Sequence, residues 1–128
     1  MVRYGIVGCG HIAKKHVTAI QNVENAELIA VCDTNEERLK EYAVGGIQGY
    51  TDLEQMLKTD VDVVCICTPS GLHADLTIQA AEAKKHVIVE KPMALTLEDA
   101  DRMIESCEKN GVKMAVVHPN RFRPAIVE

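Results

Sequence analysis

Several features that would point to other protein classes are missing from this sequence. No apolar run approaches the ~20 residues of a membrane span, and the N-terminus lacks a basic-then-apolar signal pattern. The net charge is −5 and the basic residues are scattered, which argues against nucleic-acid binding, because such proteins present a clustered basic face. There is no repeat, low-complexity segment or linker. We therefore expect one globular domain in the cytoplasm, with no membrane or nucleic-acid partner.

The cysteine content predicts free thiols. There are five cysteines, an odd number, and four lie in or beside apolar strand patterns. Cys65 and Cys67 are two residues apart in a strand and so share one face, but this spacing is not the C-x-x-C of zinc or redox sites. We predict buried thiols in a reducing compartment and no metal site.

The stretch Val2–Ala13 organises the rest of the chain. An apolar strand pattern ends at Val7 and is followed by Gly8, Gly10 and Ala13, spaced as G-x-G-x-x-A, and then by a helical pattern through His16 and Ile20. The first glycine permits a tight turn, the second lets a pyrophosphate approach the backbone, and the alanine allows close helix–strand packing. Free N–H groups at the helix start would bind the phosphate. A structural turn is the alternative.

A second strand pattern, Ala26–Cys32, ends in Asp33, about 20 residues past the glycines, where a dinucleotide site places the carboxylate that binds the adenosine ribose. This carboxylate would repel a 2′-phosphate, and no arginine follows directly, so NAD is favoured over NADP. Arg38 could still reach a phosphate. The structural alternative for Asp33 is a helix N-cap.

Strand and helix patterns alternate along the whole chain. Capping boxes at Thr34–Glu37, Thr51–Glu54 and Thr96–Asp99 predict helix starts, and Gly111 suits a helix C-cap. The other predicted elements are strands at 47–50, 61–67, 86–89 and 113–117, a helix over 72–83, and a helix after Thr96 whose apolar face includes Ala100, Met103, Ile104 and Cys107. This alternation predicts a Rossmann-type α/β fold, a doubly wound parallel sheet of six strands in the order 3-2-1-4-5-6.

Ligands bind such a sheet beyond the carboxyl ends of its strands. Besides the glycine turn and Asp33, these ends carry Thr68–His73, Glu90–Pro92 and His118–Arg121. The segment Thr68–His73 either lines the cofactor or is a turn before a helix, and His73 alone is more typical of capping or packing. In Glu90-Lys91-Pro92, the lysine could donate to an oxygen that undergoes hydride transfer, whereas the alternative is a solvated charge pair.

Three motifs together resemble a known family. G-I-V-G-C-G-H-I-A at 5–13, T-P-S-G-L-H-A at 68–74 and V-E-K-P-M-A-L-T at 89–96 resemble the N-terminal domain of the Gfo/Idh/MocA (glucose–fructose oxidoreductase/inositol dehydrogenase) family. The resemblance covers essentially the whole chain. It implies an NAD(P)-dependent oxidoreductase that transfers a hydride between nicotinamide and a secondary alcohol or ketone of a sugar, sugar nucleotide or cyclitol.

The resemblance also implies roles for individual residues. Glu90 and Lys91 would lie beside the nicotinamide as catalytic residues, with Lys91 hydrogen-bonded to substrate and a cis peptide before Pro92. The closing segment 118–124 resembles the crossover to a second domain, and its N-R-F-x-P pattern resembles that of members acting on nucleotide-linked sugars. The residues expected along the cofactor are Gly8, Gly10, His11, Ile12, Ala13, Asp33, Thr68, Pro69, Ser70, His73, Glu90 and Lys91.

Family members have a second domain that supplies most substrate contacts, and this sequence stops at Glu128. We expect residues 1–120 to form the dinucleotide-binding domain and 121–128 to begin the crossover, so that this chain alone binds cofactor without turnover, whether it is a truncated domain or a stand-alone product. The parent protein is expected to be a homo-oligomer. One alternative function is a stand-alone module that senses NAD(H), and another is a scaffold with an empty site.

Overall fold

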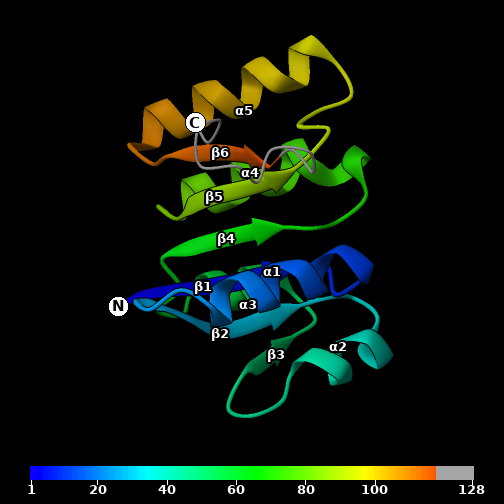
Figure 1. Ribbon diagram of the computed structural model, residues 1–128. Helices are drawn as coiled ribbons and strands as arrows, with labels where there is room; N and C mark the ends of the chain where they lie inside the picture. The colour runs from blue at the N-terminus through cyan, green and yellow to red at the C-terminus, as the bar shows by residue number, and fades with distance from the viewer. Residues whose placement is uncertain (118–128) are drawn as a thin grey trace.

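The computed structural model describes residues 1–117 and contains a single parallel sheet. Its strands are β1 (Val2–Val7), β2 (Ala26–Cys32), β3 (Gln48–Tyr50), β4 (Val63–Ile66), β5 (His86–Glu90) and β6 (Met114–Val117). They lie in the order β3-β2-β1-β4-β5-β6 (Figure 1), which confirms the predicted Rossmann-type topology. The order reverses direction between β1 and β4, so the switch point lies beyond the carboxyl ends of these two strands.

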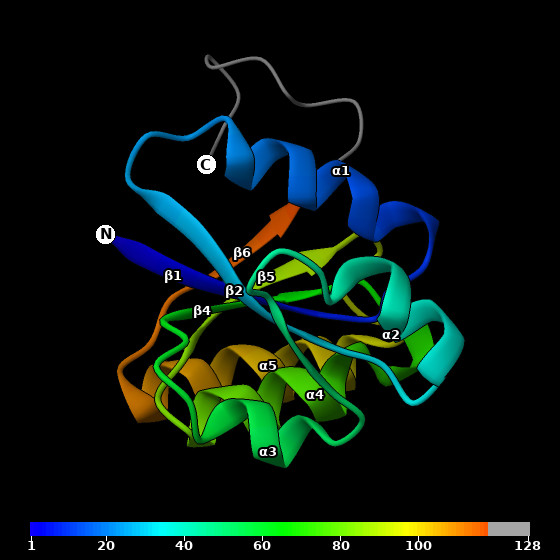
Figure 2. The same cartoon turned by 90° about the horizontal axis from the view of Figure 1, so that it is seen from below.

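Helices cover both faces of the sheet (Figure 2). One face carries α1 (His11–Gln21) and α2 (Glu36–Tyr42), and the other carries α3 (Leu53–Leu57), α4 (His73–Glu82) and α5 (Leu97–Asn110). Strand β4 is buried on both sides, and its Val64 and Ile66 are fully inaccessible, because it lies between β1 and β5 with helices on either face.

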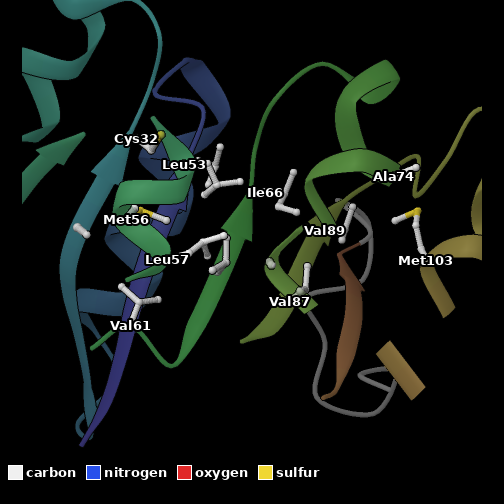
Figure 3. Packing of buried hydrophobic residues seen from close by; sticks show 14 residues of the cluster. Cys32, Leu53, Met56, Leu57, Val61, Ile66, Ala74, Val87, Val89 and Met103 are labelled. Carbon is white, nitrogen blue, oxygen red and sulfur yellow. The ribbon is translucent and has the colours of Figure 1, made fainter. Parts of the chain in front are cut away.

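The larger core lies under α3, α4 and α5. Met56 of α3 and Met103 of α5 are fully buried against strand side chains such as Ile66 and Val89 (Figure 3). On the other face, Ala13 and Ile20 of α1 pack with Cys65 of β4. In α5, Met103 and Cys107 are spaced by four and buried, whereas Ile104 is 43% exposed, so the prediction that Ile104 faces the core is wrong. One residue step turns it about 100° away from that stripe.

Two helix starts differ from the predicted capping boxes by one residue. The side chain of Asn35, not Thr34, caps α2, and that of Asp52, not Thr51, caps α3. In α5 the predicted cap is confirmed, because Thr96 Oγ1 accepts from the Asp99 N–H at 3.1 Å. Gly111 ends the same helix at φ +69°, the left-handed conformation that glycine adopts most easily.

All five cysteines are free thiols, and four of them are buried. Burial raises the pKa of Cys9 and Cys65 to about 12 and that of Cys32 to about 11, so these thiols are neutral and unreactive at neutral pH. Cys65 and Cys67 belong to the same core cluster, as their spacing predicts. No helix within residues 1–117 is long and apolar enough to cross a membrane.

Candidate functional site

The glycine turn between β1 and α1 has the geometry expected for a phosphate cradle. Gly8 has φ +93°, and a Cβ there would lie 2.9 Å from the backbone of Cys67 and Thr68, so this position requires glycine. At Gly10, a Cβ would meet nothing within 4 Å, so the space in front of the backbone is open. Helix α1 has no side-chain cap and no acidic residue in its first turn, which leaves N–H groups for an anion.

The turn is held in place by two side chains from neighbouring elements. Asp33 Oδ2, at the end of β2, accepts a hydrogen bond from the Cys9 N–H at 2.7 Å. The Tyr42 hydroxyl, on α2, donates to the Gly10 carbonyl at 2.8 Å. The role of Tyr42 could not be read from the sequence, because the aromatic ring also fits an ordinary core position.

Asp33 is nearly buried, and its carboxylate contacts backbone on both sides. In addition to the Cys9 contact, Oδ1 accepts from the Asn35 N–H at 2.8 Å. Because Asn35 caps α2, the N-cap alternative for Asp33 is wrong. Each carboxylate oxygen has two lone pairs, so both keep acceptor capacity for ribose hydroxyls. The charge of Arg38 lowers the pKa of the Cys9 thiol, against the larger effect of burial, so this guanidinium is electrostatically coupled to the glycine turn.

The segment after β4 lies directly beside the glycine turn. Thr68 Oγ1 is buried and has no hydrogen-bond partner within the described residues. A buried hydroxyl without a partner is costly, so this atom is a candidate for a ligand contact. Pro69 is exposed, and Ser70 begins a short 3₁₀ turn, Ser70–Leu72, although the side chain of Ser70 lies outside what the structure describes.

His73 is 1% exposed and joins two loops. Its Nε2 lies 2.8 Å from the Thr68 carbonyl and its Nδ1 lies 2.9 Å from the Pro92 carbonyl. Both contacts are donated at once only by the protonated imidazolium, because a neutral imidazole carries one N–H. With both ring nitrogens facing carbonyls, the imidazole holds the end of β4 against the segment after β5.

Glu90 and Lys91 follow each other at the carboxyl end of β5 but face different surroundings. Lys91 is exposed, and its main-chain N–H donates to the Val117 carbonyl of β6 at 3.2 Å. The peptide between Lys91 and Pro92 is cis, in agreement with what the resemblance implies. Glu90 is half-buried and hydrogen-bonds His16 of α1, which the sequence showed only as a polar residue within an apolar helical stripe.

The predicted site residues therefore gather at one edge of the sheet. The glycine turn follows β1, Asp33 follows β2, Thr68 follows β4, and Glu90 and Lys91 lie at the end of β5. His11 is exposed at the first residue of α1, and Ile12 is partly buried behind it. The segment His118–Arg121 and the crossover 121–128 lie outside the described residues. Within residues 1–117, no group of three or more His, Cys, Asp or Glu side chains could hold a metal ion.

A parallel sheet of this order, with an open glycine turn at the start of α1 and an acidic residue ending β2, defines a dinucleotide-binding domain. The chain belongs to the Gfo/Idh/MocA oxidoreductase family, described as having an NAD-binding Rossmann fold, which matches residues 2–118.

Among curated relatives, myo-inositol 2-dehydrogenase of Thermotoga maritima is 36% identical over 124 residues, which cover 94% of this chain and 37% of that protein. D-apiose dehydrogenase of Paraburkholderia graminis is 38% identical, over 94% of this chain and 33% of that protein. The WlbA dehydrogenase of Bordetella pertussis, solved with NADH and UDP-GlcNAcA, superposes with a TM-score of 0.91 at 41% identity, over 98% of this chain and 39% of that one. This chain thus spans between 33% and 39% of the length of these relatives.

Proposed function

We propose that this chain is the NAD-binding domain of a dehydrogenase that acts on a sugar, sugar nucleotide or cyclitol. The single observation that carries the proposal is the open glycine turn, where Gly8 is required by contact with β4 and Gly10 leaves free space before the start of α1. The hydroxyl of Thr68, on the other side of the switch point, has no partner among residues 1–117, and this supports the same location for the cofactor.

The orientation proposed for the dinucleotide follows the general rule for sheets of this topology. The pyrophosphate lies at Gly10, His11 and the start of α1, and the adenosine ribose lies at Asp33, on the β2 side. The nicotinamide half then extends over the ends of β4 and β5, toward Thr68 and Lys91. When bound, NAD supplies the hydride acceptor. The protein residues orient it and exclude water, and the exposed ammonium of Lys91 donates to the substrate oxygen.

The substrate class is proposed from the relatives. Their names cover a cyclitol, a pentose and, in the crystal structure, a nucleotide-linked sugar acid, all of which carry secondary hydroxyl groups. A second domain would supply most substrate contacts, and the cytoplasmic location and homo-oligomeric state of the parent protein stay predictions. The alternative of a stand-alone NAD(H) sensor gains nothing from these relatives, because each is named as a dehydrogenase.

Calorimetric titration of this chain with NAD⁺, NADH, NADP⁺ and NADPH tests the proposal. We expect NAD(H) to bind more tightly than NADP(H), because the Asp33 carboxylate repels a 2′-phosphate. The variant Gly10→Ala should lose most of this affinity while staying folded, since its Cβ occupies the pyrophosphate space. Lys58→Ala, an exposed change directly after the end of α3, is the control. Equal binding by Gly10→Ala would contradict the location of the site.

A further inference from the structure

One polar pair links the helix of the glycine turn to the end of β5. His16 Nε2, in the second turn of α1, hydrogen-bonds Glu90 Oε2, and only 12% and 13% of the two side chains is exposed. A carboxylate only accepts hydrogen bonds, so the imidazole is the donor. The pair joins residues that are 74 positions apart in the sequence, and thereby links α1 to the end of β5.

The surroundings of the pair are largely apolar. It lies in a hollow of about 240 Å³ between α1 and the sheet, which Ile88 and Val117 also line. Because few polar groups compete for it, the Glu90 carboxylate depends on His16 for its hydrogen bond.

The titratable neighbours of the pair come from three elements. Lys15 of α1, Tyr4 of β1 and Cys65 of β4 line the same hollow. Burial raises the pKa of Tyr4. Burial and the charge of Glu90 raise the pKa of Cys65 to about 12. Burial, Cys65 and Glu90 raise the pKa of Cys67. These three groups stay neutral between about pH 6 and 8, and Lys15 is the basic side chain that lines the hollow. In this set, the imidazole is the group whose chemistry allows a charge change in that range.

We propose that His16 is a positioning residue that fixes the Glu90 carboxylate and sets the net charge of the His16–Glu90 pair. The charge of the pair in turn sets the relative affinity of the site for the oxidised and the reduced nicotinamide. This inference rests on the proposed function, which lays the nicotinamide half over the ends of β4 and β5. The oxidised ring carries a positive charge and the reduced ring does not. A Glu90 carboxylate beside a neutral imidazole therefore favours NAD⁺, and an imidazolium cancels this preference.

The test is the ratio of the dissociation constants for NADH and NAD⁺ at about pH 8 and about pH 6. In the wild-type chain we expect the preference for NAD⁺ to fall by about fivefold at the lower pH, the effect of one elementary charge that solvent partly screens. The variant His16→Gln keeps an N–H donor but cannot be protonated, so its ratio should not change with pH. The control is His86→Gln, which removes an imidazole from the opposite end of β5 and should behave like wild type.

A second measurement does not need the cofactor. In the cofactor-free chain, the Nε2 proton of His16 should give a downfield NMR signal that is protected from exchange and that disappears in Glu90→Gln. Cofactor binding with a wild-type ratio that does not change with pH, or with a pH dependence of the ratio that His16→Gln does not abolish, overturns this inference and leaves the proposed function standing. Absence of the protected proton also overturns it. A chain that binds neither NAD⁺ nor NADH contradicts the proposed function, and this inference fails with it.

Discussion

The same substitution to alanine should lower the stability at one glycine of the phosphate turn and lower only the cofactor affinity at the other. At Gly8, an alanine has to adopt φ +93°, which costs about 1–3 kcal/mol for a non-glycine residue. Its Cβ would also lie 2.9 Å from backbone atoms of Cys67 and Thr68. Those atoms cannot move freely, because the Cys67 N–H donates to the Val7 carbonyl at 2.8 Å in the centre of the sheet. Overpacking of this kind adds about 1–3 kcal/mol.

We therefore expect Gly8→Ala to lower the free energy of unfolding by about 2–6 kcal/mol. With a urea dependence of about 2 kcal/mol per molar, this is a shift of the unfolding midpoint by about 1–3 M. Gly10 has φ −92° and ψ −160°, an extended conformation open to alanine, and its Cβ would have free space. The weaker N-cap of alanine and its lower unfolded-state entropy offset each other, so Gly10→Ala should stay within about 0.5 kcal/mol of wild type.

Urea denaturation followed by circular dichroism, together with NAD⁺ titration of each variant, measures both effects. Gly8→Ala should lose stability, whereas Gly10→Ala should lose cofactor affinity alone. A Gly8→Ala midpoint indistinguishable from wild type would refute the reasoning from φ and contact distance. A Gly10→Ala variant as unstable as Gly8→Ala would refute the claim that the space before Gly10 is empty.

Three further changes have defined outcomes. His73→Ala removes the imidazole that contacts the Thr68 and Pro92 carbonyls and opens a cavity, so urea denaturation should show a loss of about 2–4 kcal/mol. In the full-length protein, Lys91→Ala should strongly reduce turnover in a steady-state assay and leave NAD affinity nearly intact, and unchanged turnover would remove Lys91 from the mechanism. Burial raises the pKa of Cys9 and Cys65 to about 12 and that of Cys32 to about 11. Because burial favours the neutral thiols, the stability that they contribute is complete below their unfolded pKa of about 8.5. This stability is lost as the pH rises toward the pKa values of the folded state. Unfolding at a series of pH values should therefore show a decline above about pH 9, by about 1.4 kcal/mol per pH unit for each thiol, and a flat profile would contradict it.

The fold could be predicted from the sequence because its information is local. Apolar runs such as Val61–Cys67 and the glycine turn each define one element, and their alternation leaves few topologies for a parallel sheet. The exact helix starts were less predictable. Thr34 has the spacing of a capping box, but Asp33 accepts from the Asn35 N–H, so α2 begins later and Asn35 becomes its cap. The choice between Thr34 and Asn35 as the cap of α2 depends on the position of Asp33 beside the glycine turn. The local sequence pattern around Thr34 does not contain this information.

The contacts that hold the candidate site together are non-local, and for this reason motifs alone did not give them. Asp33 fixes the turn 24 residues before it, and His16 reaches Glu90 74 residues further on. Each motif places a loop at the edge of the sheet, but the register of β1 with β2 and β4, and of β4 with β5, decides which loops meet. A side chain that ties two such loops together transmits a change in one to the other. The glycine turn and the end of β5 are joined through α1 by His16, so substitutions beneath the helix should alter binding at the nicotinamide end without touching the cofactor.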